Sequence, residues 1–412
     1  MASVIVEAGI YYGSADTSGY WRIGHPTAGK IPFKLAGGPV WVDYSDRLSE
    51  FTVSRTSSTN GPLVEWNAST MTCTLRNTDG VLDPTLLSQP PPGSAIRIRK
   101  VHAGISYPIF RGYVDSWVPS RSPTEAAISV IATDGMDLLS RDDRAPLGAP
   151  VGAGELTSDR VGRILDSAGW PTSERSISVG SSTVQGATLG GRALDEIKLV
   201  TKSEVGEFFV DPNGMAVFRG RQVLRAMATG ESVATFGTDL AGGELPYAGH
   251  LGSSYDRRDM SNVVRATRVS GAQQTRTDAA SVARYRESAA PSADGLLLET
   301  DTEVASWAGY VLRQQSVPQF RVTSLTVDAR VAPSLLYPVV LGAGPSDRMT
   351  VVRRAPGGIV DPQDVLVRSI QHTWRRPDQW RTTYGFAPAA KYDRYWRIGH
   401  PILGRIGTPL AF

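Results

Sequence analysis

The sequence predicts a mainly β, multi-domain protein whose strands are interrupted by an α+β portion. A chain of 412 residues is too long for a single core, which predicts two to four domains. Its 42 glycines and 27 prolines are scattered, as is typical of many short strands joined by turns. Helical patterns are few, at about 157–169, 191–205 and 302–315, whereas a period of two recurs on both sides of the middle.

The first strand-rich region is predicted over residues 39–145. Apolar and polar residues alternate there with the period of a half-buried strand, so that Ile96, Ile98 and Lys100 are expected on one face. Five or six short antiparallel strands separated by turn signals predict a small β-barrel or sandwich. The predicted strands cover 51–55, 69–76, 95–101, 107–118 and 127–132.

An α+β domain is predicted over residues 146–250. Thr157 or Ser158 is the expected cap of a first helix that ends at 169–171, and a second helix is expected from Gly191 to about Val205. Residues 207–219 read as a hairpin, because Asp-Pro-Asn-Gly supplies a turn between two apolar segments.

Residues 251–390 form the second predicted β-rich domain, with one helix at 302–315 capped by Asp301 or Thr302. Its strongest strands are 320–327, 365–374 and 380–386, and the last two are expected to pair across residues 375–379. Residues 1–38 and 391–412 look irregular and are expected to be arms.

Both arms carry the same motif. The sequence YWRIGHP stands at 20–26 and again at 395–401, inside a shared pattern that spans 20–36 and 395–411. Two copies so far apart cannot stack as neighbouring repeats of a solenoid. We therefore expect two docking arms on one body, which indicates a part in an assembly.

Each copy offers Tyr and Trp anchors, an Arg donor and a Gly-His-Pro bend, which suits an extended arm in a groove or a strand added to a sheet edge. The alternative is a local hairpin used twice within one subunit. The candidate interaction residues are Tyr20, Trp21, Arg22, His25, Tyr395, Trp396, Arg397 and His400.

The composition narrows the class of protein. A net charge of +3 does not favour nucleic acid as a specific partner, and no apolar stretch is long enough for stable insertion into a membrane. Cys73 is the only cysteine, which excludes an internal disulfide framework. No secretory signal is recognisable, so we expect the protein in the cytosol or exported by another route.

No catalytic, metal or cofactor site is predicted. None of the five histidines has a metal-binding spacing, and no G-x-S-x-G motif occurs. The Asn77–Asp83 segment reads as an Asx-turn at a strand end, not a calcium loop. The adjacent carboxylates at 142–143 and 195–196 are interpreted as solvated, and the glycine-rich loop at 186–192 lacks the Lys-Ser/Thr of a phosphate-binding loop.

Several basic residues lie near aromatic ones. Arg97, Arg99 and Lys100 read as a basic strand edge, and further arginines follow at 353–354, 375–376 and 381. We interpret most of them as interface residues and a few as lining a lumen through which DNA passes.

A series of segments occurs in a recognisable order and spacing along the chain. These segments are 40–48, 74–84, 93–99, 107–117, 128–139, 164–171, 193–197, 206–214 and 261–264. The series resembles the N-terminal module of minor tail proteins from long, non-contractile-tailed phages of actinobacteria, and the resemblance covers roughly residues 40–388.

This resemblance implies a baseplate hub-like fold of small barrels and an α/β domain, a trimer, and a place at the tail tip of a virion assembled in the host cytoplasm. Its implied partners are the distal tail protein ring, the tape measure protein and other minor tail or fibre proteins. The implied function is structural: joining the tail tube to host-binding tip components and closing the tube before DNA release. The alternatives are a distal tail ring protein, a glycan-binding adhesin or a cell-wall-degrading tail protein.

Overall fold

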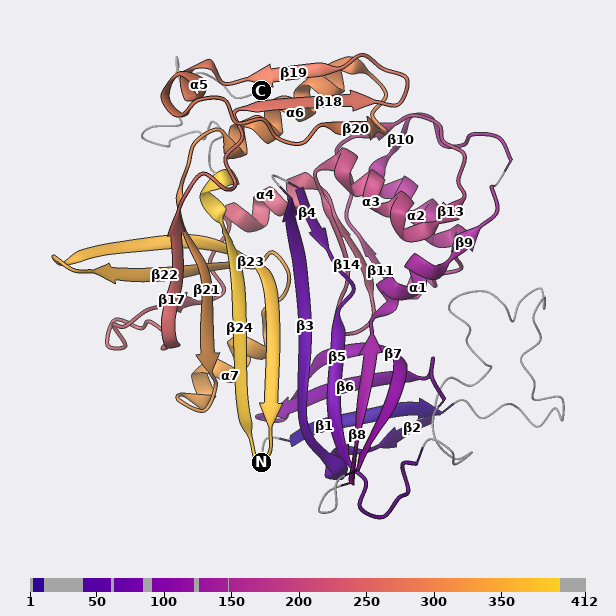
Figure 1. Ribbon diagram of the computed structural model, residues 1–412, viewed down its shortest axis with the longest axis vertical. Coiled ribbons are helices and arrows are strands. Elements are labelled where there is room, and N and C mark those ends of the chain that lie inside the picture. Colours follow the sequence, from indigo (N-terminus) through magenta and orange to yellow (C-terminus); the bar gives the residue numbers. More distant parts are fainter. Residues whose placement is uncertain are drawn as a thin grey trace.

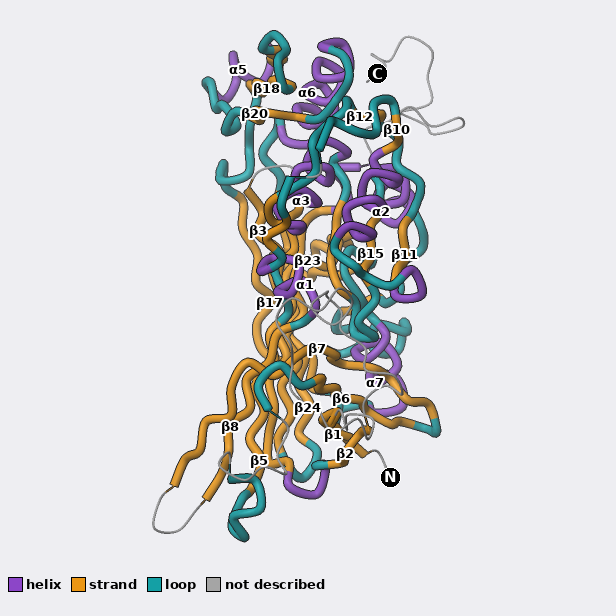
Figure 2. Tube along the Cα trace, turned by 90° about the vertical axis from the view of Figure 1, so that its right-hand side faces the viewer, coloured by secondary structure: helices purple, strands orange, loops and turns teal. Residues whose placement is uncertain are grey.

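A computed structural model describes residues 3–10, 40–60, 63–83, 91–121, 126–146 and 148–392. The predicted mainly β class with an α+β portion is confirmed. Strands fill the lower part of the body, while α2, α3 and α6 gather in the upper part (Figures 1 and 2). Within the described residues no helix has the length and apolar character needed to cross a membrane.

One 14-stranded, mostly antiparallel sheet forms the body, in the order β17-β21-β24-β23-β3-β5-β8-β7-β6-β1-β2, with β4, β16 and β22 as branches. Its strands are β1 (Ser3–Ile10), β2 (Val40–Asp43), β3 (Leu48–Asn60), β4 (Leu63–Trp66), β5 (Thr70–Arg76), β6 (Ala95–His102), β7 (Ile105–Arg121), β8 (Ala126–Thr133), β16 (Thr235–Phe236), β17 (Ala248–Tyr255), β21 (Phe320–Asp328), β22 (Arg348–Ala355), β23 (Ile359–Arg375) and β24 (Gln379–Pro388).

The two predicted strand regions are therefore parts of one sheet. β3 pairs with β23 in the register Phe51↔Trp374, and the predicted hairpin of β23 and β24 is present. Within the described residues the strands form no closed barrel, because the first set continues through β3 into β23 instead of returning on itself.

The core of this sheet follows the predicted alternation. Met71, Cys73 and Leu75 are buried on β5, and Ile96, Ile98 and Lys100 share the inner face of β6, as expected. The fully buried Lys100 places its ammonium 2.6 Å from Asp378 and over the ring of Tyr337 on α7 (Pro333–Gly342). Lys100 thus ties β6 to the β23–β24 turn.

The α+β portion contains α2 (Thr157–Ser167), α3 (Ala193–Glu204) and the predicted hairpin of β14 (Glu207–Val210) and β15 (Ala216–Arg219). The predicted cap of α2 is wrong, since Leu156 is the N-cap and Thr157 lies inside the helix. Thr157 instead donates from its hydroxyl to the buried Glu204 at 2.9 Å. Short strands complete this part: β9 (Asp143–Arg144), β10 (Glu155–Leu156), β11 (Arg175–Ile177), β12 (Thr183–Val184) and β13 (Gly191–Arg192).

A small sheet of β18 (Val263–Arg268), β19 (Gln274–Thr277) and β20 (Ala293–Leu296) packs against α6 (Asp301–Gln315) in the upper part of Figure 1. The cap predicted at Asp301 or Thr302 is one or two residues late. Thr300 is the N-cap, and it forms a capping box with Glu303.

Some elements were not predicted. Residues 1–38 look irregular in sequence and were expected to contain no long regular element, but they include β1, an eight-residue strand that pairs with β2 and β6. The helices that the sequence did not reveal are α1 (Gly135–Arg141), α4 (Arg221–Thr229), α5 (Ala279–Tyr285) and α7. Three of them span only two or three turns, and α7 is apolar on nearly all sides, which hides its helical period.

The capping box of α6 gives a stability prediction. Thr300→Ala removes the hydroxyl that accepts from the Glu303 amide at 3.2 Å, so it should lower the free energy of unfolding by about 1 kcal/mol. Thr302→Ala, two residues on and exposed, should change it by less than about 0.5 kcal/mol. Urea unfolding measures both, and an equal loss in the two variants would contradict the assignment of the cap.

Candidate interaction sites

The eight predicted interaction residues lie outside the described residues, Tyr20, Trp21, Arg22 and His25 within 11–39 and Tyr395, Trp396, Arg397 and His400 within 393–412. Their points of attachment are described. Residues 11–39 connect β1 to β2, whose ends pair in the register Ile10↔Val40. The second copy follows the 3-10 helix η3 (Ala389–Tyr392), which packs on α4 and α6.

These two attachments lie at opposite ends of the body. The β1–β2 pair is in the lower part of Figure 1, and η3 joins α4 and α6 in the upper part. The segment with the first copy is also not a free terminal arm. β1 precedes it and β2 follows it in the sequence, and both strands belong to the large sheet. The two segments that contain the motif are therefore attached to the body at opposite ends.

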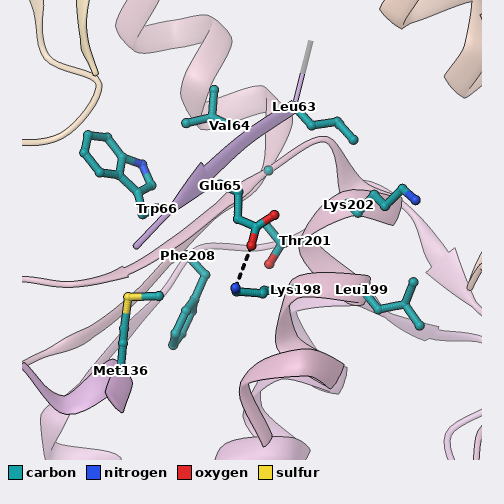
Figure 3. A pocket seen from close by; sticks show the side chains of 11 residues that line it. Leu63, Val64, Glu65, Trp66, Met136, Lys198, Leu199, Thr201, Lys202 and Phe208 are labelled. Atoms are coloured by element: carbon teal, nitrogen blue, oxygen red, sulfur yellow. Dashed lines mark ion pairs between the residues drawn. The ribbon is translucent and has the colours of Figure 1, made fainter. Parts of the chain in front are cut away.

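An apolar pocket of about 250 Å³ opens between β4 and α3 (Figure 3). Buried Trp66, Met136 and Phe208 line its inside. At its rim the Lys198 ammonium lies 2.6 Å from the Glu65 carboxylate, and both side chains are partly exposed. The full lining is Leu63, Val64, Glu65, Trp66, Met136, Lys198, Leu199, Thr201, Lys202, Gly206 and Phe208.

The wall of this pocket is held by the fully buried Glu207. Its carboxylate accepts a hydrogen bond from the Trp66 indole at 2.9 Å, from the Ser346 hydroxyl at 2.5 Å and from the Arg219 guanidinium at 3.0 Å. Arg368, also buried, lies 3.6 Å away. One carboxylate thus joins β4, the β14–β15 hairpin and the β23 side of the large sheet.

A second concave surface of about 430 Å³ lies on the outer face of β3, β5, β23 and β24. It is polar, since the threonines of β5 point outward where Cys73 between them points to the core. Arg375 spans neighbouring strands to reach Glu50 at 2.9 Å. Its lining is Glu50, Phe51, Thr52, Thr72, Thr74, Thr373, Trp374, Arg375, Gln379 and Arg381.

Neither surface carries a recognisable catalytic arrangement. Among the described residues no group of three His, Cys, Asp or Glu side chains is placed to hold a metal ion. The β4–α3 pocket offers apolar walls and a few charges at its rim, which is the chemistry of an interaction site. Both surfaces are built from segments far apart in the sequence, so local patterns could not reveal them.

No family model and no curated protein matches the sequence. Among solved structures, a tail protein from Neisseria meningitidis MC58 matches with a TM-score of 0.59 and 12% identity, over 93% of this chain and 96% of that one. The 43 kDa tail protein of prophage MuSo2 from Shewanella oneidensis matches with a TM-score of 0.57 and 13% identity, over 95% and 100% of the two chains. The chain shares its fold with these two tail proteins.

The likeness in fold also extends to part of a longer chain. A chain of the half-lidded Francisella PdpA–VgrG complex matches with a TM-score of 0.51 and 9% identity, over 95% of this chain and 58% of that one. All three identities are low, so the likeness lies in the fold and not in the sequence.

The basic strand edge expected at 97–100 is wrong for Lys100, which faces the core. Arg97 and Arg99 face outward, and both pair with Glu7 on β1, at 2.8 and 2.9 Å. The other arginines in question also have partners within the chain. These contacts are Arg353 with Asp361, Arg354 with Glu244, Arg375 with Glu50, Arg381 with Asp328, and Arg376 with the Leu48 carbonyl.

The interpretation of the Asn77–Asp83 segment as an Asx-turn is confirmed. The Asp79 carboxylate accepts from the Val81 amide two residues later at 3.3 Å, and Gly80 between them has a φ of +72°. Two hydrogen bonds from Arg47 lower the pKa of Asp79 to about 2. The Asp79 carboxylate, which a calcium ion at this loop would need as a ligand, is therefore paired with the Arg47 guanidinium.

The adjacent carboxylates were interpreted as solvated, which is wrong for Asp142 and Glu196. Both are half-buried, and both pair with Arg144. Glu196 also accepts from the Gly190 amide at 2.8 Å. The Gly190 amide of the glycine-rich loop thus donates to a carboxylate of the same chain and not to a bound anion.

Removal of the Glu207 carboxylate should loosen the pocket and destabilise the fold. Glu207→Ala leaves the buried Trp66 indole and Ser346 hydroxyl without the carboxylate that accepts from them, and it removes the negative charge beside the buried Arg368, which should cost about 3–5 kcal/mol. Glu65→Ala removes a carboxylate from the exposed rim of the same pocket and should cost less than about 1 kcal/mol. Denaturant unfolding compares them, and a similar loss for both would show that Glu207 is not the central contact.

The fully buried His372 gives a pH prediction. Burial, with a smaller effect of Arg55, lowers its pKa to about 3, so it stays neutral in the folded chain while the unfolded chain takes up a proton below about pH 6.5. The unfolded state then binds more protons, and stability should fall by about 2 kcal/mol between pH 6.5 and 5. His372→Gln should remove this part of the slope in urea unfolding, and an unchanged slope would contradict the assignment.

Proposed function

We propose that the chain is a structural hub protein of a phage tail tip, which joins the distal end of the tail tube to tip and host-binding components and closes the tube before DNA release. The observation that supports this is the fold likeness to two phage tail proteins over more than nine tenths of each chain. A likeness of that extent includes the large sheet, the α+β portion and the upper sheet together.

The proposed assembly is a homotrimer that contacts the distal tail protein ring, the tape measure protein and other minor tail or fibre proteins. The large sheet supports assembly, because among the described strands β17 and β2 end its path and leave one edge each without a partner. Unpaired backbone groups on an edge strand pair readily with another chain. Tyr255 on β17 is also 68% exposed, which is unusual for a large aromatic side chain outside an interface.

The repeated motif supports the same proposal. One copy is attached at each end of the body, so a subunit can engage one kind of surface in two directions along its long axis. A chain that joins two layers of a tail needs contacts of this kind. We propose a non-enzymatic role, with the Tyr-Trp-Arg residues of both copies as the contact residues.

Gold labelling of a C-terminal tag on intact virions tests the proposed function. We expect gold at the end of the tail that lies away from the head, when the particles are viewed by electron microscopy. The same tag is probed on disrupted particles, to show that the label reaches it. Gold absent from intact virions, with the tag accessible after disruption, would refute a tail-tip role and favour an adhesin or an enzyme.

A further inference from the structure

We propose that the pocket between β4 and α3 binds Trp396 and Arg397 of the C-terminal motif copy from a neighbouring subunit. The proposal rests on the proposed function in one respect, that the chain forms a homo-oligomer. The segment proposed to occupy the pocket is residues 395–411, and the residues that receive it are those that line the pocket.

The size of the pocket fits one large side chain. Binding sites for small molecules commonly hold about 300–1,000 Å³, and this pocket holds about 250 Å³. Trp66, Met136 and Phe208 form an apolar and polarisable interior, in which an indole can be buried beside a thioether and aromatic rings. Tryptophan is also among the residues most enriched at the centres of interfaces.

The charges at the rim complement the Trp-Arg pair. Lys198 lies at the mouth of the pocket beside Glu65, where its ammonium can lie over the face of an inserted indole (Figure 3). The Glu65 side chain is about half exposed, and its carboxylate pairs with Lys198. Exposed ion pairs of this kind are weak, so Arg397 can take the Glu65 carboxylate when Trp396 enters.

The pocket is also already formed in the single chain. Trp66 is fixed through its indole to Glu207, and Lys202 is fixed through its carbonyl, which accepts from the Trp307 indole of α6 at 2.9 Å. A preformed site spends little binding free energy on ordering its own walls.

The C-terminal arm leaves the body near the level of the pocket. Trp396 follows Tyr392 by four residues, so its Cα lies at most about 14 Å from that of Tyr392. η3 packs on α4, α6 and β23, whereas the pocket walls come from β4, α3, α1 and β14. Both regions lie in the upper part of the body, so a neighbour in the same ring presents its pocket at the level where the arm leaves. The segment with the first copy is attached to β1 and β2, at the opposite end of the body.

Cysteine cross-linking of the full-length chain tests this docking. One chain carries Leu199→Cys in the pocket, a second carries Ile398→Cys beside Trp396, and the two are co-expressed with different tags. The native Cys73 stays silent, because it is buried and its thiol pKa is raised to about 12. We expect a 199–398 disulfide between the two chains, at a yield about tenfold above the controls, because docking raises the local thiol concentration.

The controls change one element at a time. Ile23→Cys places the thiol in the first copy, and Val179→Cys places it on an exposed loop outside the pocket. Trp396→Ala in the Ile398→Cys chain should reduce the yield about tenfold, since it removes the anchor and leaves the described body unchanged. A chain with both Leu199→Cys and Ile398→Cys reports docking within one subunit.

The proposal is overturned by a 199–398 yield at the control level, by a 199–23 product in its place, by an undiminished yield in the Trp396→Ala chain, or by a disulfide formed only within the doubly substituted chain. A chain that stays monomeric and forms no such disulfide overturns it as well. The outcome is separable from the proposed function. Gold at the tail tip without the disulfide refutes the docking alone, and the disulfide without gold refutes the tail-tip role alone.

Discussion

The arrangement of this protein depends on two buried glutamates that lie three residues apart. Glu204 ends α3 and accepts from Thr157 and from the amides of Ser181 and Ser182, while Glu207 begins β14 and accepts from Trp66, Ser346 and Arg219. An ionised carboxylate is expensive to bury unless donors surround it. Each glutamate therefore fixes the segments that supply its donors, Glu204 within the α+β portion and Glu207 between that portion and the large sheet. The left-handed Val205 (φ 57°) between them lets the chain turn from helix to strand in two residues.

This constraint has a consequence for binding. Because Glu207 holds the Trp66 indole and also the loop that carries Ser346, the β4–α3 pocket keeps its shape only while the sheet and the hairpin keep their relative positions. The polar face of β3, β5, β23 and β24 belongs to the same sheet. The two surfaces are thus connected through the large sheet, to which the pocket is joined by the pairing of β4 with β3 and by the Glu207 carboxylate.

Individual strands and helices could be predicted from the sequence, but few of the contacts between distant segments could. Alternation identified β5, β6 and the β23–β24 hairpin, because each has one face in the core, and amphipathic spacing identified α2, α3 and α6. It could not show that Thr56 pairs with Ser369, which joins two regions expected to be separate. The partners of the arginines could not be predicted for the same reason. Arg97 pairs with Glu7 and Arg354 pairs with Glu244, and both partners lie far from the arginine in the sequence. The pocket could not be predicted because its walls come from β4, α1, α3 and β14, which are far apart in the sequence. The repeated motif could be found, because two identical stretches of sequence are recognisable without knowledge of the fold.

The repeat and the pocket together constrain the assembly. Each subunit has two copies of the motif and one β4–α3 pocket, and the copies leave from opposite ends of the body. If the C-terminal copies fill the pockets of one ring, the first copies need receiving surfaces of another kind of chain or another layer. Because the two copies share the same Tyr-Trp-Arg side chains, that second surface must offer similar chemistry: an apolar cavity for an indole, and a carboxylate at its rim for the arginine. If the C-terminal copy docks in the β4–α3 pocket, the sequence identity of the two copies thus requires the surface that receives the first copy to resemble that pocket.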